Sequence, residues 1–135
     1  MKILYYLGIF VFLNYANAKD IGQTQITAED GIEVFQKEKF YLLKNNVEII
    51  SDNFDLKANI VKAYFNEDLY DITKIHAEEN VLLNSNQRNL SASGNILEFS
   101  FSEEKIKIFG KNSKMTLNKT NMFSNETIEI DNING

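Results

Sequence analysis

Pairs of adjacent acids and one histidine are the residues of this chain whose types suggest acid–base chemistry. Among the pairs are Glu29-Asp30, Glu78-Glu79 and Glu103-Glu104, and His76 is the only histidine. A glycosidase needs two carboxylates placed across its substrate, whereas neighbours on one strand point to opposite faces of a sheet. We therefore expect these acids to lie on a solvated surface, and we predict that the chain is not an enzyme.

Metal, redox and phosphate-binding chemistry have no basis in the sequence either. The chain has no cysteine, so neither a disulfide nor a cysteine-containing zinc site is expected. His76 has the opposite parity to Ile75 and Ala77, which predicts an exposed side chain. Gly94-Asn95 and Asp30-Gly31 indicate turns or bulges, and no glycine-rich loop of the phosphate-binding type occurs. We predict no cofactor and no metal.

The charge balance and the first residues limit the partners and the location. The formal net charge is −5, which argues against nucleic acid because phosphate binding needs a basic face. The N-terminus reads MKILYYLGIFVFLNYANA, with one lysine, an apolar run and an Ala-Asn-Ala end. This layout predicts a signal peptide at residues 1–18, cleaved after Ala18, and a mature domain at residues 19–135. The alternative is an uncleaved membrane anchor, although a spanning helix needs roughly 20 apolar residues.

The elements that must position any functional group are predicted to be strands. Apolar residues alternate with polar ones over the whole chain after the N-terminal segment, which is the pattern of a half-buried strand. Clusters at 52–53, 66–68, 84–86, 102–104 and 118–121 predict turns. We expect seven to eleven strands and no helix, with 60–72 the one stretch whose pattern also fits a helix face. A two-sheet sandwich, a folded-over single sheet and a short β-solenoid all fit this pattern.

The chain also repeats itself. ITAEDGIEV at 26–34 returns as IHAEENVLL at 75–83, and Asn46-Val47 returns as Asn80-Val81. A pattern that is used twice is more often a structural unit than a catalytic motif. Such repeats predict similar strands stacked as rungs, each covering its neighbour.

These rungs resemble the LptA/OstA-like family of periplasmic lipopolysaccharide transport proteins. The family pattern has an apolar-x-Ala-acid start, an Asn-Val turn and a strand that ends in an apolar-x-Ala-x-x-Val sequence. The matching residues are Ile26, Ala28, Glu29, Asn46, Val47, Leu56, Ala58 and Val61, then Ile75, Ala77, Asn80 and Val81 in the second unit. Phe109 to Asn112 and Asn125 to Ile128 resemble a later rung of the family.

The resemblance implies an all-β fold, a β-jellyroll of stacked antiparallel strands that forms an open, V-shaped groove. It implies a protein of the Gram-negative periplasm that binds the lipid A acyl chains of lipopolysaccharide. It also implies that the domain bridges LptC-like and LptD-like partners of the inner and outer membranes, and that copies can associate head to tail. The alternatives are an LptC-like anchored partner and a small carbohydrate-binding jellyroll or solenoid, which would need exposed aromatic residues near Glu29 or Glu78.

The groove lining expected from this resemblance consists of the inward parity of the predicted strands. An apolar stripe of period two is also the pattern of an ordinary core, and both interpretations stay open at this point. Small residues such as Ala28, Ala58, Ala77 and Ala92 would leave room for lipid or let two sheets approach closely. The full set of expected lining residues is Ile26, Ala28, Leu43, Val47, Ile49, Leu56, Ala58, Ile75, Ala77, Val81, Ala92, Leu97, Phe99, Ile106, Ile108, Met115, Leu117 and Ile128.

Overall fold

A computed structural model describes residues 2–5, 24–68 and 71–131. Within these residues the chain forms strands and turns but no helix, and the strands join into one antiparallel sheet. The eleven strands are β1 Lys2–Tyr5, β2 Gln25–Thr27, β3 Ile32–Phe35, β4 Phe40–Ile50, β5 Asp55–Phe65, β6 Ile72–Ser85, β7 Leu90–Ser100, β8 Lys105–Phe109, β9 Ser113–Leu117, β10 Thr120–Ser124 and β11 Thr127–Asp131.

The four long strands β4 to β7 bend in the middle. The pairing between β4 and β5 shifts between Lys44 and Val47, and the pairing between β6 and β7 shifts between Glu78 and Val81. Asn45, Asn46, Glu79 and Asn80 have positive φ angles of 68°, 49°, 71° and 56° at these shifts. Left-handed residues inserted into a strand form a bulge that turns the chain. The repeated Asn-Val pairs therefore mark the bends.

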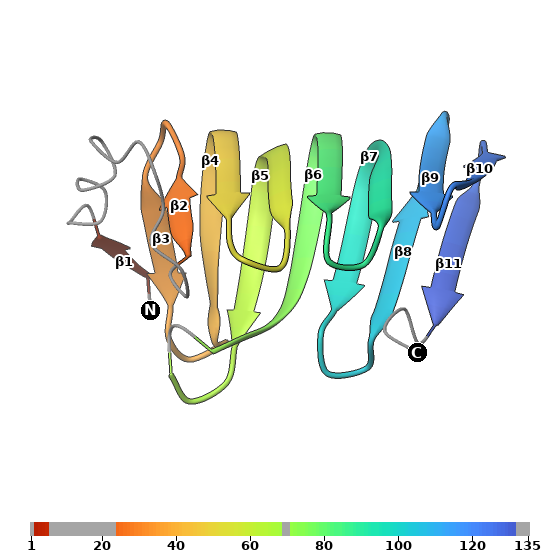
Figure 1. The fold of residues 1–135 in the computed structure, drawn as a ribbon. Coiled ribbons are helices and arrows are strands. Elements are labelled where there is room, and N and C mark those ends of the chain that lie inside the picture. Colours follow the sequence, from red (N-terminus) through yellow and green to blue (C-terminus); the bar gives the residue numbers. More distant parts are fainter. Residues whose placement is uncertain (1, 6–23, 69–70, 132–135) are drawn as a thin grey trace.

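The bends fold the sheet into two layers, which Figure 1 shows with the bends at the top. The front layer consists of β2, residues 47–50, 55–58, 81–85 and 90–93, β9 and β10. The back layer consists of β1, β3, residues 40–44, 60–65, 72–78 and 96–100, β8 and β11. Opposite the bends, the hairpin turns of the two layers form two rows, and we call the side between these rows the mouth.

Three ladders of paired apolar residues line the space between the layers. The front ladder is Ile26, Ile49, Leu56, Leu83, Ala92, Met115 and Met122. The back ladder near the bends is Ile32, Leu43, Val61, Ala77, Leu97, Ile108 and Ile128, and the back ladder near the mouth is Val34, Tyr41, Ala63, Ile75, Phe99, Ile106 and Ile130. Each ladder runs across the whole sheet, so the apolar lining is continuous from one end of the domain to the other.

The structure confirms the expected all-β jellyroll and selects the folded-over single sheet among the architectures left open. Of the stretch 60–72, residues 60–65 end β5 and Ile72 begins β6, so the helical alternative is wrong for the described part of this stretch. Two turn predictions were displaced. Asn84 and Ser85 still belong to β6, and Thr120 begins β10, because each hairpin reverses one or two residues away from the predicted cluster.

The N-terminal strand bears on the predicted signal peptide. Residues 2–5 form β1, which pairs with β3 along Ile32–Phe35. The predicted cleavage site after Ala18 lies outside the described residues, and cleavage there stays a prediction. Removal of residues 1–18 would leave the other side of β3 without a partner strand. In the part of the chain that the structure describes, there is no helix of the length and hydropathy needed to span a bilayer.

Candidate functional site

The predicted lining residues all lie inside the folded sheet or against its core. Thirteen of the eighteen belong to the three ladders, which face one another across the two layers. Val47, Ala58 and Val81 are buried in the front layer beside the bends. Ala28 and Leu117 are half-buried and pack against the core from its bend and mouth sides. Alternation therefore located the inner face correctly, while a role in lipid binding is a separate matter.

The interior is closely filled by the protein's own side chains. Leu43, Leu56, Leu83, Leu97 and Ile108 are each 0% exposed. Along the ladders, larger inner side chains lie beside small ones. Ala77, for example, lies between Val61 and Leu97. A ligand between the layers would have to part them, and the contacts that hold the mouth shut are therefore part of the site.

Aromatic rings join the two layers at the mouth. Phe54, in the front-layer turn between β4 and β5, places its ring 6.0 Å from that of Phe99 and 5.5 Å from that of Phe101. The rings of Phe99 and Phe101, both on the back layer, stack on each other at 4.5 Å. Arg88, in the front-layer turn between β6 and β7, holds its guanidinium 5.5 Å from the centre of the Phe99 ring. We call Phe54, Arg88, Phe99 and Phe101 the mouth cluster.

Several interior residues were absent from the predicted lining. Phe54 follows the turn residues Asp52-Asn53, where alternation gives no signal, and only its aromatic type indicated burial. Val61, Ala63 and Phe65 lie in the stretch whose pattern also fitted a helix. The remaining omitted core residues, which had the correct parity, are Val34, Tyr41, Leu83 and Leu90.

The only histidine takes part in a ladder of polar side chains on the outer face of the back layer. His76 Nε2 lies 2.8 Å from Glu78 Oε2 and His76 Nδ1 lies 3.1 Å from Glu98 Oε2. Its side chain lies on the outer face, as its parity predicts, but is only 23% exposed and so less exposed than expected. Lys62 and Lys107 continue the ladder on the neighbouring strands. Cross-strand pairs of opposite charge stabilise a sheet. Among the described residues, no group of three histidine or acidic side chains is placed to hold a metal ion.

The acid pair nearest the N-terminus ties two bends together. The side-chain amide of Asn45 donates to Asp30 Oδ2 at 2.6 Å, and the side-chain amide of Asn46 donates to Glu29 Oε2. These bonds connect the turn before β3 to the bend of β4. Glu29 and Asp30 are exposed as expected, and their geometry is that of a structural contact.

The aromatic residues that a carbohydrate-binding site would need are mostly inside the fold. Tyr41 and Phe99 are buried, and Phe101 belongs to the mouth cluster. Tyr64 packs beside Phe40, with ring centres 5.5 Å apart. These four residues form no outer platform beside Glu29 or Glu78, so the condition set for the carbohydrate alternative is not met.

Strands β2, β10 and β11 each have one strand partner, so their other sides are free edges of the described sheet. Lysine side chains often protect such edges by their charge, but Lys37, Lys39, Lys105 and Lys107 do not lie on any of these three edges. Lys37 and Lys39 lie in the turn between β3 and β4, and β8, which carries Lys105 and Lys107, is paired on both sides.

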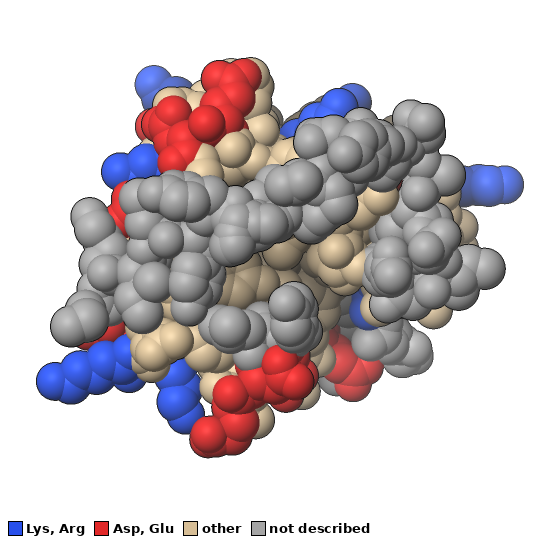
Figure 2. All heavy atoms as spheres, turned by 90° about the vertical axis from the view of Figure 1, so that its left-hand side faces the viewer, with Lys and Arg blue, Asp and Glu red and all other residues tan. Residues whose placement is uncertain are grey.

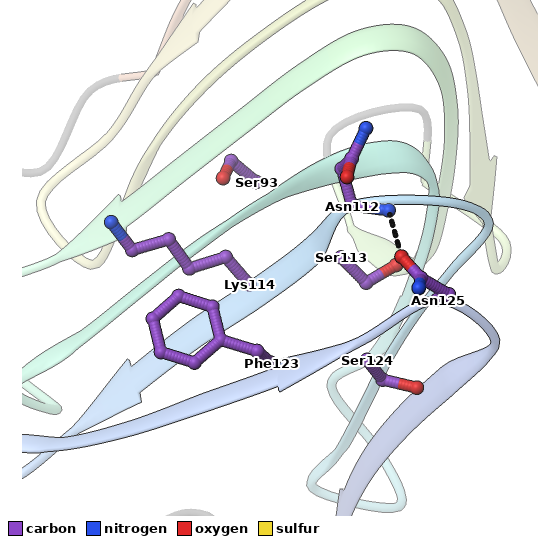
Figure 3. Close-up of a pocket in the computed structure, with 7 residues that line it drawn as sticks. All are labelled: Ser93, Asn112, Ser113, Lys114, Phe123, Ser124 and Asn125. Atoms are coloured by element: carbon purple, nitrogen blue, oxygen red, sulfur yellow. Dashed lines mark hydrogen bonds between the residues drawn. The ribbon is translucent and has the colours of Figure 1, made fainter.

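A surface hollow of about 400 Å³ lies beside the β10 edge (Figure 3). Phe123 is 69% exposed at this hollow, and Lys114 Nζ lies 5.7 Å from its ring centre. The backbone N–H of Asn112 donates to Asn125 Oδ1 at 3.2 Å. This bond connects the segment between β8 and β9 to the segment between β10 and β11. The other lining residues are Ser93, Ser113 and Ser124. An exposed phenylalanine beside a free strand edge is a feature of contact surfaces.

An open, folded-over antiparallel sheet with a continuous apolar interior and free edge strands defines an open β-jellyroll domain. The chain belongs to the LptA/(LptD N-terminal domain) LPS transport protein family. The sequence model of this family matches residues 25–135. A similar solved structure is LptH from Pseudomonas aeruginosa, described as the LptA homologous periplasmic component of the conserved lipopolysaccharide transport device. The two share 11% identity and a TM-score of 0.67 over 81% of this chain and 76% of that one, so this likeness concerns the fold. No curated protein matches the chain.

Proposed function

We propose that this chain is a periplasmic carrier of lipopolysaccharide, which holds acyl chains between its two layers. The single observation that supports this best is the continuity of the three apolar ladders in a member of this family. Burying one CH₂ group is worth about 0.8 kcal/mol, so an acyl chain of a dozen carbons gains roughly 10 kcal/mol on leaving water. Such a chain needs a long apolar path, and the ladders provide one from edge to edge.

The ends of the sheet support joining to similar domains. β-strand addition at a free edge is a common way for domains to associate. Figure 2 looks onto the N-terminal side, where the charged side chains of the described residues lie around the periphery. At the other end lie β10, β11 and the exposed Phe123. We infer that LptC-like and LptD-like domains, or further copies of this chain, add to these edges.

The strand directions determine the geometry of such a join. Both β3 and β11 run from the bends towards the mouth, and both β2 and β10 run from the mouth towards the bends. If two copies join with their mouths on the same side, β11 of one copy must pair with β3 of the next in parallel. This holds for a mature chain that lacks β1, since β1 would otherwise occupy that side of β3.

Co-purification with radiolabelled lipopolysaccharide tests the carrier function. The intact lipid should stay with the protein through gel filtration, and the deacylated saccharide should not, because the ladders offer nothing to a sugar alone. The protein should also unfold at a higher urea concentration when the lipid is bound, since a ligand of the folded state stabilises it. Equal retention of both forms would show that the saccharide, and not the acyl chain, is recognised.

A further inference from the structure

The filled interior raises the question of where a lipid enters. On the bend side, each long strand passes from one layer to the other as a continuous chain, so the layers cannot separate there. On the mouth side, the layers end in separate hairpin turns. A lipid with several acyl chains and an anionic headgroup can reach the ladders laterally only through the mouth.

The mouth cluster provides a non-covalent connection between the layers on that side. Phe54 is 8% exposed although it lies in a turn, because its ring rests on Phe99 and Phe101 of the opposite layer. Its turn is closed locally, with Ser51 Oγ donating to the Phe54 carbonyl at 3.1 Å and accepting from the Phe54 amide at 3.1 Å. Ser85 Oγ also donates to the Asn53 carbonyl at 2.7 Å. The turn is thus anchored in its own layer, and the ring of Phe54 crosses to the other layer.

Arg88 adds a cation at the same opening. Its guanidinium lies over Phe99, and Phe99 is an inner residue of the back ladder near the mouth. Arg88 Nη1 also donates to Ser85 Oγ at 3.4 Å, and the side chain is half-buried. A guanidinium binds phosphate oxygens through two parallel hydrogen bonds. An anionic headgroup whose acyl chains had passed Phe99 would lie within reach of this cation.

We propose that the mouth cluster is the lipid gate, in which Phe54 closes the opening and Arg88 receives the anionic headgroup. This inference rests on the proposed function, since it describes how the same interior is filled. Acyl chains displace the Phe54 ring from Phe99 and Phe101 and take its place against them. The headgroup then stays at the water boundary, where the Arg88 guanidinium turns from the ring to the phosphate.

A thiol bridge across the mouth tests the gate within one folded protein. The chain has no cysteine, so the double variant Phe54→Cys with Phe101→Cys carries the only two thiols. A short bifunctional thiol reagent bridges them, and uptake of radiolabelled lipopolysaccharide is compared before and after bridging. We expect at least a tenfold slower uptake after bridging, while the unbridged variant takes up lipid at least as fast as the unsubstituted protein. Equal uptake by both forms overturns the gate and leaves the carrier function standing. Absence of uptake in the unsubstituted protein overturns both.

The headgroup contact is tested separately with a matched pair of cations. Arg88→Gln and Lys114→Gln each remove a cation that lies over a phenylalanine ring, at 5.5 and 5.7 Å, but only the first is at the mouth. We expect Arg88→Gln to weaken binding of phosphorylated lipopolysaccharide about tenfold, as expected for a charged hydrogen bond. Dephosphorylated lipid should bind both variants equally, and Lys114→Gln should bind both lipids as the unsubstituted protein does. An equal loss for both lipids in Arg88→Gln would overturn the headgroup assignment.

Discussion

Two adjacent leucines on β6 offer a direct test of the inner face. Leu83 is 0% exposed in the front ladder between Leu56 and Ala92, whereas Leu82 is 43% exposed on the outer face. Leu83→Ala removes about three methylene equivalents, or roughly 2.4 kcal/mol of transfer free energy, and the cavity brings the loss of unfolding free energy to about 3–4 kcal/mol. Leu82→Ala makes the same chemical change on the outside, and we expect a loss below about 1 kcal/mol.

Urea unfolding of both variants measures this difference. A loss of about 3 kcal/mol is a large part of the 5–15 kcal/mol that is typical of single domains, so the midpoint of Leu83→Ala should move clearly at an unchanged slope. A larger loss for Leu82→Ala than for Leu83→Ala would refute the assigned register, because a shift by one residue exchanges the two faces of a strand. A loss below about 1 kcal/mol at Leu83 would refute the close packing of the interior.

Three further results are expected. Asn80→Val should cost roughly 1–2 kcal/mol of unfolding free energy in urea titrations, because Asn80 has a positive φ and β-branched residues avoid that region; no loss would argue against the bend. In the mature protein, engineered cysteines at Glu33 and Thr127, both at the bend ends of their strands, should cross-link neighbouring copies, and the pair Glu33 with Asp131 should not; the reverse result would indicate an antiparallel join. Mass spectrometry of the exported protein should find Lys19 as the first residue, and an intact N-terminus would favour the anchored LptC-like alternative.

The sequence predicted the inner face well because alternation is a local property. Ile75 and Ala77, or Ile106 and Ile108, have the same parity whatever the sheet does next, and each pair lies inside. The repeated Asn-Val pairs were visible as repeats, but their role as bends depends on the positive φ of Asn46 and Asn80. Alternation continues through such a bulge and gives no sign of it.

The mouth cluster could not be predicted in the same way. Phe54 and Phe99 are far apart in the sequence and meet only because the sheet folds over. Arg88 lies in a turn, where charged residues are common, so the sequence gives no sign of a special role. Its position over Phe99 follows only from the tertiary structure. The type of Lys105 likewise gives no indication that its strand, β8, is paired on both sides, by β7 and β11.

Site-specific photocross-linking along the front ladder tests the central claim most directly. A photoreactive side chain would be placed in turn at Ile26, Ile49, Ala92 and Met122, with Leu82 on the outer face as the control. If the ladder is a continuous acyl path, radiolabelled lipopolysaccharide should cross-link at all four inner positions and not at Leu82. Cross-linking at Leu82 alone, or at no inner position while the lipid still binds, would contradict the account.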